Sequence, residues 1–317
     1  MERRRIGSLQ VSVVGVGCNN FGWRIDSDAA SKVVDAALEA GINFFDTADV
    51  YGGTESEEFL GRALGRHRDQ VVIATKFGAK LDDRRRGAKP EYVRRAVEDS
   101  LRRLGTDRID LYQLHMPDRD VPIEDTLGVL DELVRAGKVR EIGCSNFSVD
   151  QLRAAQTAAR DRAPFVSVQN HYSLLHRDPE QDVIPECERV KIAFLPYFPL
   201  ASGLLTGKYR KGQPAPEGSR IGTGGRFSGM LSDQSLDTVE SLIAFAESRR
   251  HTVLELAISW LIGRPAIASV IAGATSPQQV KANAAAIVWR LGNPDLAEID
   301  AIVSPPREAT ERAQVRN

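Results

Sequence analysis

The segment GINFFDTADVYGG at residues 41–53 carries the plan that decides the fold of this 317-residue chain. An amphipathic helical pattern precedes the segment, Gly41 can close that helix in the left-handed conformation, and a short apolar run follows at residues 42–45. The same order recurs with Gly65 before residues 71–75, Gly105 before 109–114 and Gly137 before 139–143. The chain therefore repeats a unit in which a helix leads into a strand.

Further apolar runs complete a set of eight, at residues 13–17, 165–168, 192–195 and 267–271. These runs lack a strict apolar and polar alternation, as is typical of strands that are covered on both faces. Eight parallel strands with intervening helices predict an α/β fold, namely a (β/α)8 TIM barrel. We expect residues 1–317 to form this barrel as a single domain.

Segments outside the repeat predict additions to the barrel. Residues 3–6 and 11–13 flank Gly7-Ser8 and predict an N-terminal β-hairpin at the bottom of the barrel. A stretch rich in Gly and Pro at residues 211–232 predicts a lid loop between the seventh and eighth strands. Extra helices are expected near residues 236–249 and at 294–303.

Composition limits the class of function. The 42 Lys and Arg residues balance 43 Asp and Glu residues, so no strongly basic surface calls for nucleic acid or an acidic membrane. No apolar stretch reaches the roughly 18 residues of a membrane span, and the N-terminus lacks a signal-peptide core. Cys18, Cys144 and Cys187 are scattered without a CxxC spacing, which argues against a metal site. We therefore predict a cytoplasmic protein without membrane, nucleic-acid or metal partners.

Reactive side chains follow three consecutive strands. Asp46 and Tyr51 come after the second apolar run, Lys76 after the third and His115 after the fourth. Each has an ordinary structural role open to it on its own, such as a turn cap for Asp46 or a surface position for Lys76. Barrel enzymes, however, hold their chemistry where strands run into the following loops. The joint placement therefore favours a catalytic group.

The next strands end in groups suited to a flat ligand. Ser145-Asn146 and Gln169-Asn170 can hold an amide through paired hydrogen bonds, and Tyr197 offers a ring for stacking. Together they predict a ligand that carries a planar carboxamide.

These residues stand in motifs that resemble those of the aldo-keto reductases, in particular a bacterial branch similar to the potassium-channel β subunits. The motifs are DTA at 46–48 with YG at 51–52, ATK at 74–76, LYQLH at 111–115, GCSN at 143–146, PLASGLLTGK at 199–208 and IAGATSP at 271–277. The resemblance covers nearly the whole chain and implies a (β/α)8 enzyme that reduces an aldehyde or ketone with a nicotinamide cofactor.

The resemblance also implies a catalytic tetrad of Asp46, Tyr51, Lys76 and His115. Tyr51 is then the proton donor, and the Lys76 ammonium is expected to lower its pKa from roughly 10. Asp46 would hold Lys76, and a neutral His115 would orient the substrate carbonyl.

The cofactor contacts that the resemblance implies run across the top of the barrel, from the nicotinamide to the adenosine. In that order they are Gly17, Cys18, Asn19, Asp46, Ser145, Asn146, Gln169, Tyr197, Phe198, Leu200, Ser202, Lys208, Arg226, Gly273, Ser276, Gln279 and Asn283. Tyr197 would lie under the nicotinamide ring, and Arg226 would act as a clamp from the lid. Cys18-Asn19 departs from the Thr and larger residue that the family more often has there.

NADPH is the expected cofactor, and NADH is expected to serve with lower preference. The segment after the eighth strand has Gly273, Ala274 and Gln279 where relatives carry Lys or Arg. Ser276-Pro277 with Gln279 is nevertheless typical of a helix start, where free N–H groups favour a phosphate.

Three other functions are compatible with parts of the sequence. A cofactor-holding redox sensor or regulatory subunit with little turnover is the main alternative, although the complete tetrad favours an enzyme. A Rossmann dehydrogenase is rejected because Gly15-Val16-Gly17 is followed by Asn20 rather than a third glycine. A sugar-phosphate isomerase would leave Tyr197 and the paired amides without a role. The carbonyl substrate, the direction of reaction and the oligomeric state are left open.

Overall fold

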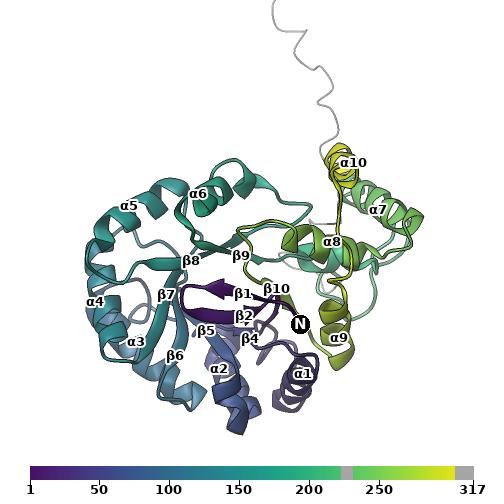
Figure 1. The fold of residues 1–317 in the computed structure, drawn as a ribbon. Coiled ribbons are helices and arrows are strands. Elements are labelled where there is room, and N and C mark those ends of the chain that lie inside the picture. The colour runs from purple at the N-terminus through teal and green to yellow at the C-terminus, as the bar shows by residue number, and fades with distance from the viewer. Residues whose placement is uncertain (223–230, 304–317) are drawn as a thin grey trace, which may run out of the picture.

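The computed structural model describes residues 1–222 and 231–303 and contains a parallel eight-stranded sheet (Figure 1). In chain order the strands are β3 (Val14–Gly17), β4 (Phe44–Asp46), β5 (Val72–Phe77), β6 (Ile109–Leu114), β7 (Val139–Ser145), β8 (Phe165–His171), β9 (Ala193–Tyr197) and β10 (Val270–Gly273). From β3 to β9 each strand pairs with the next, and β10 pairs with β3.

The sheet closes through the segment that leads into β10. The Phe194 amide of β9 donates to the Ala266 carbonyl oxygen over 2.8 Å, and the Ala268 amide donates to the Phe194 carbonyl oxygen over 3.2 Å. These bonds join the last two strands beside the β10–β3 pair. The predicted (β/α)8 barrel is confirmed.

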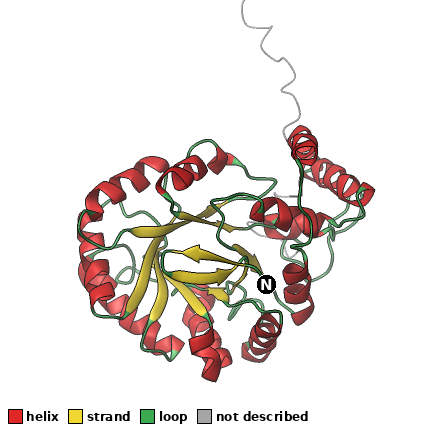
Figure 2. Ribbon diagram, viewed as in Figure 1, coloured by secondary structure: helices red, strands yellow, loops and turns green. Residues whose placement is uncertain are grey.

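Helices surround the strands as an outer ring (Figure 2). They are α1 (Ser27–Glu39), α2 (Glu55–Leu64), α3 (Pro90–Leu104), α4 (Ile123–Arg135), α5 (Val149–Ala159), α6 (Val183–Val190), α8 (Val253–Ile262) and α9 (Pro277–Ala285). The four glycines predicted to close helices, Gly41, Gly65, Gly105 and Gly137, all have positive φ, a region that side-chain-bearing residues seldom adopt. Among the helices of the described residues, none combines the length and apolar character that crossing a bilayer requires.

The predicted hairpin is present as β1 (Arg3–Ile6) and β2 (Leu9–Ser12), and it lies across one end of the barrel (Figure 1). Ile6, Leu9 and Val11 are buried in one apolar cluster with Phe44 and Leu111 of the barrel interior. The second strand begins at Leu9, two positions earlier than predicted, because Ile6 pairs with Leu9 across a tight Gly7-Ser8 turn. The hairpin thus fills the barrel end opposite the loops that follow the strands.

The two extra helices are also present, as α7 (Asp233–Ser248) and α10 (Asn293–Val303), outside the ring of helices (Figure 1). Arg249 at the end of α7 joins them through ion pairs to Asp295 (2.9 Å) and Glu298 (2.6 Å) of α10. Of the predicted lid loop, residues 211–222 and 231–232 are described, whereas Arg226 lies outside the described residues. Movement of residues 211–232 as a lid stays a prediction.

Candidate active site

The four predicted catalytic residues meet at the barrel end opposite the hairpin. Asp46 ends β4, Lys76 lies in β5, His115 follows β6, and Tyr51 opens the short 3-10 turn after β4. Parallel strands bring their carboxyl ends to one edge, which explains why residues from three strands converge. A cavity of about 970 Å³ opens here, and its wall includes Asp46, Tyr51 and His115.

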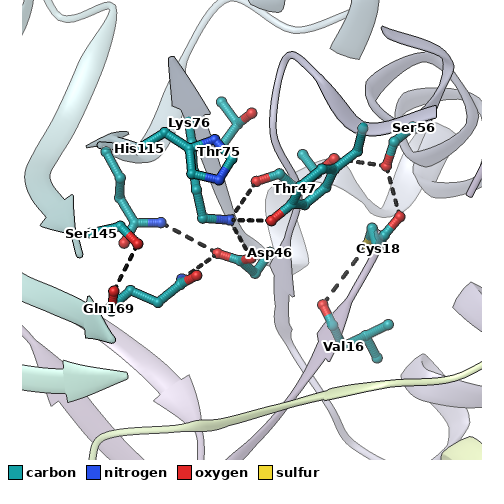
Figure 3. Close-up of polar contacts among 12 residues, drawn as sticks. Val16, Cys18, Asp46, Thr47, Ser56, Thr75, Lys76, His115, Ser145 and Gln169 are labelled. Atoms are coloured by element: carbon teal, nitrogen blue, oxygen red, sulfur yellow. Dashed lines mark hydrogen bonds and ion pairs between the residues drawn. The ribbon is translucent and has the colours of Figure 1, made fainter. Parts of the chain in front are cut away.

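Lys76 is held by three oxygen atoms (Figure 3). Its Nζ lies 2.5 Å from Asp46 Oδ2, 2.8 Å from the Thr47 carbonyl oxygen and 3.5 Å from the Tyr51 hydroxyl. The Lys76 side chain is 0% exposed and that of Asp46 is 4% exposed. An ammonium has three donors, so this arrangement satisfies a fully buried cation.

The other Asp46 oxygen accepts two amide hydrogen bonds. Gln169 Nε2 donates to Asp46 Oδ1 over 2.8 Å, and Gln113 Nε2 donates to the same oxygen over 3.3 Å. Hydrogen-bond donors therefore contact both oxygens of the Asp46 carboxylate, and they compensate its negative charge where water is excluded. Because Gln169 uses its side-chain nitrogen here, its side-chain oxygen Oε1 can accept a further hydrogen bond.

The protonation of the Lys76 and Tyr51 pair differs in part from the expectation. Burial alone would lower the pKa of Lys76, but Asp46 and Tyr51 outweigh it and the pKa is raised above 10.5. Burial raises the pKa of Tyr51 above 10.0, and the opposing effect of Lys76 does not overcome it. The predicted fall in the Tyr51 pKa is therefore wrong in net direction. The reason is that burial outweighs the effect of the Lys76 charge, which the Asp46 charge also partly offsets.

His115 is neutral at physiological pH. Burial, together with the positive charge of Lys76, lowers its pKa from 6.5 to about 3. Its ring meets the Tyr51 ring edge to face, with centroids 5.8 Å apart and planes at 84°. The imidazole can therefore act as a hydrogen-bond donor beside the Tyr51 hydroxyl without becoming charged.

The predicted amide-binding residues form a connected chain. The Tyr197 hydroxyl donates to Asn146 Oδ1 over 2.8 Å, and Asn146 Nδ2 donates to the His115 carbonyl oxygen over 3.0 Å. Ser145 Oγ donates to the Gln169 carbonyl oxygen over 2.7 Å. Asn146 has a φ of 62°, a left-handed conformation that Asn tolerates better than most residues. These hydrogen bonds hold the side chains of Ser145, Asn146 and Tyr197 in place between β6 and β9.

Most of the predicted cofactor contacts line the same cavity. They are Gly17, Asn19, Asp46, Ser145, Asn146, Gln169, Tyr197, Phe198, Leu200, Ser202, Lys208, Gly273, Gln279 and Asn283. Cys18 is buried in the core, and its carbonyl oxygen accepts from Ser56 Oγ over 2.9 Å. Ser276 caps α9, where its Oγ accepts from the Gln279 amide over 3.3 Å.

Two residues with clear contacts at the site were not predicted from the sequence. Gln113 supports Asp46, and a buried amide inside the apolar run of β6 could have signalled it. Asn20 donates to the Ala274 carbonyl oxygen over 3.1 Å and accepts from Arg220 over 2.7 Å. It thereby ties the loop after β3 to the end of β10 and to the segment before residue 222. Because Arg220 lies 200 positions from Asn20 in the sequence, no pattern around Asn20 predicts this hydrogen bond.

Fold and site together define a (β/α)8-barrel oxidoreductase. The sequence model of the Aldo/keto reductase family matches residues 13–304, and the chain belongs to that family. It is accordingly an NAD(P)H-dependent enzyme.

Known relatives agree with this assignment. Aldo-keto reductase YhdN of Bacillus subtilis (strain 168) is 35% identical over 283 residues, which cover 86% of this chain and 84% of that protein. Probable aldo-keto reductase 1 of Glycine max is 35% identical over 287 residues, with coverage of 88% and 82%. The solved structure of a glycerol dehydrogenase from Gluconobacter oxydans is similar with a TM-score of 0.82 and 32% identity, over 95% of this chain and 94% of that one.

Proposed function

We propose that this enzyme reduces an aldehyde or ketone to an alcohol with NADPH in the cytosol, and that Tyr51 donates the proton. The observation that carries the proposal is the buried contact of Lys76 Nζ with both Asp46 and the Tyr51 hydroxyl, beside a neutral His115. A tyrosine hydroxyl next to a buried cation can release a proton more readily than one in an apolar pocket without that cation.

The cavity beyond the tetrad fits an elongated anionic cofactor. Ser202 Oγ is buried there and has no hydrogen-bond partner among the described residues, and Lys208 lines the same wall. Gly203 has a φ of 103°, and a Cβ atom at that position would approach Lys208 Cε to 3.0 Å. A side chain at position 203 would therefore crowd Lys208. Ser202 and Lys208 would hold the phosphates, and Tyr197 would lie against the nicotinamide, which supplies the hydride when bound.

The side chains of the tetrad account for the fate of the proton. Hydride addition at the carbonyl carbon leaves negative charge on the oxygen, and the Tyr51 hydroxyl meets that charge by giving up its proton. Lys76 then stabilises the tyrosinate that remains, while Asp46 holds Lys76 in place. A hydrogen bond from neutral His115 to the carbonyl oxygen would orient it toward Tyr51. The product is the alcohol, with the hydride on carbon and the proton on oxygen.

A turnover assay separates this activity from the alternative of a cofactor-holding sensor. With excess NADPH and a panel of aldehydes and ketones, we expect each chain to oxidise many equivalents of NADPH. The panel should include glyceraldehyde and dihydroxyacetone, because one solved relative is a glycerol dehydrogenase. Oxidation that stops at one equivalent per chain for every carbonyl would support the sensor instead.

Cofactor choice is expected to depend on the start of α9. Ser276 caps this helix, and Gln279 Oε1 accepts from the Thr275 amide over 2.8 Å. We propose that the adenosine 2′-phosphate of NADPH binds here, with backbone donors in place of a cation. Double substitution Ser276→Ala with Gln279→Ala should lower the ratio of kcat/KM for NADPH over NADH by about 10- to 150-fold, since a charge-assisted hydrogen bond is worth roughly 1.5–3 kcal/mol.

Lys281→Ala is the matched control for this comparison. Lys281 also lies on α9, but its Nζ pairs with Glu39 Oε2 over 3.2 Å on the outside of the barrel. The control should therefore leave the cofactor ratio unchanged. An NADH preference in the wild type, or an unchanged ratio in the double variant, would contradict binding of the phosphate at this helix.

A further inference from the structure

Three flat side chains form a column at the carboxyl ends of β8 and β9. His171 ends β8 and Tyr197 ends β9, and the strand register pairs the two residues. Their ring planes differ by 13°, with centroids 5.4 Å apart. His176 stacks on His171 in turn, with an interplanar angle of 8° and centroids 3.9 Å apart. We call Tyr197, His171 and His176 the ring column.

Tyr197 is the member of the ring column that reaches the cavity wall. Phe198 closes the edge of the column, since its ring meets Tyr197 at 76° and His171 at 83°, with centroids 5.4 and 5.7 Å away. The histidines therefore support Tyr197 from the protein side.

Tyr197 is held at two points. Its hydroxyl donates to Asn146 Oδ1 over 2.8 Å, which fixes the far end of the side chain. A hydrogen bond at one atom still allows the ring to tilt about that atom and the backbone. The stacked imidazole of His171 removes this freedom, because a shift in tilt would lose the ring contact.

His171 supplies a neutral face. Burial and the neighbouring His176 lower its pKa from 6.5 to about 4. Its Nε2 is buried and has no hydrogen-bond partner among the described residues, so the contact with Tyr197 rests on the ring rather than on a polar anchor. A neutral ring adds no positive charge behind a surface that is to accept an oxidised, positively charged nicotinamide.

We propose that His171, on which His176 stacks, is a positioning residue. It sets the tilt of the Tyr197 ring and thereby the position at which the nicotinamide ring binds. This inference rests on the proposed function, in which the nicotinamide lies against Tyr197. It predicts that NADPH binding and the rate of reduction depend on the flat ring at position 171 and not on the nitrogen atoms of that ring.

Two substitutions at His171 test the role of the flat ring separately from that of its nitrogen atoms. His171→Leu removes the flat face and should raise the Kd for NADPH about 2- to 10-fold, in keeping with the usual worth of an aromatic pair. It should also slow the single-turnover reduction of a carbonyl substrate. His171→Phe keeps a flat ring and should stay within about 2-fold of wild type in both measurements. Fluorescence titration with NADPH gives the Kd, and stopped-flow absorbance gives the single-turnover rate.

Substitutions at two further histidines test whether the effect is specific to the ring column. His67→Leu, at a partly exposed histidine in the turn after α2, should change neither quantity. His176→Leu removes the outer ring and should shift the Kd in the same direction by a smaller factor, even if His171→Leu fails to fold. An unchanged Kd and rate in His171→Leu with a wild-type Tm, an unchanged Kd in His176→Leu, or equal losses in His171→Phe and His171→Leu would overturn the inference.

Failure of the proposed nicotinamide site has a different signature. Tyr197→Ala removes the platform itself and should weaken NADPH binding more than any histidine substitution. If Tyr197→Ala binds NADPH like wild type, the cofactor placement is wrong. If Tyr197→Ala loses binding while His171→Leu does not, only the role of His171 is rejected.

Discussion

Replacing Tyr51 with Phe is expected to lower carbonyl reduction by about 100- to 10,000-fold, the usual contribution of a general acid. The substitution removes the hydroxyl that lies 3.5 Å from Lys76 Nζ and keeps the ring that packs against His115. NADPH binding should therefore stay nearly intact. Steady-state kcat with a reactive aldehyde and a fluorescence Kd for NADPH measure the two effects separately.

Tyr112→Phe is a matched control for the loss of a buried hydroxyl. Tyr112 lies on β6, is fully buried, and its hydroxyl has no hydrogen-bond partner among the described residues. This control should reduce the aldehyde at nearly the wild-type rate. If Tyr51→Phe keeps more than a tenth of wild-type turnover, Tyr51 is not the proton donor.

Lys76→Met is expected to move the alkaline limb of the pH profile for reduction to higher pH and to lower the maximal rate. In the proposed mechanism reduction requires protonated Tyr51, so the rate of reduction falls as the pH rises through the pKa of that group. Lys76 opposes the rise in this pKa that burial causes, and its loss lets the pKa climb further. For alcohol oxidation, which needs the tyrosinate, the rising limb should move to higher pH as well.

The same substitution is expected to destabilise the fold. Asp46 would stay buried with only the amides of Gln113 and Gln169 as side-chain donors. Leaving one partner of a buried ion pair behind costs about 3–5 kcal/mol in the free energy of unfolding, measurable by urea denaturation. Asp46→Asn removes the negative charge that helps to raise the pKa of Tyr51, so its alkaline limb should move to lower pH, opposite to Lys76→Met. A Lys76→Met profile that overlays wild type after scaling would refute the coupling between Lys76 and Tyr51.

Two strands end later than the apolar runs from which they were predicted. The apolar run predicted for β8 stops at Val168, yet the strand continues to His171 and pairs with β9 through Asn170 and His171. Hydrophobicity marks the apolar part of a strand, whereas backbone pairing continues into the polar residues that follow it. β5 likewise extends past the apolar run, to Phe77, which makes the buried Lys76 part of the strand.

The order of strands and the residues after them were determined by the sequence alone. Eight apolar runs separated by helices leave few arrangements other than a barrel, and parallel strands bring Asp46, Lys76 and His115 to one end of it. The meeting of these side chains could therefore be predicted without coordinates, because the direction of the chain places them at the same end of the barrel.

Only the tertiary structure decided how these groups are paired and charged. Gln169 donates to Asp46 across 123 positions of sequence, and the ring column forms because β8 and β9 lie side by side. The pKa of Tyr51 rises rather than falls because burial outweighs the nearby cation. Such effects depend on the distances between side chains and on the exclusion of water, and both arise only when remote segments pack together.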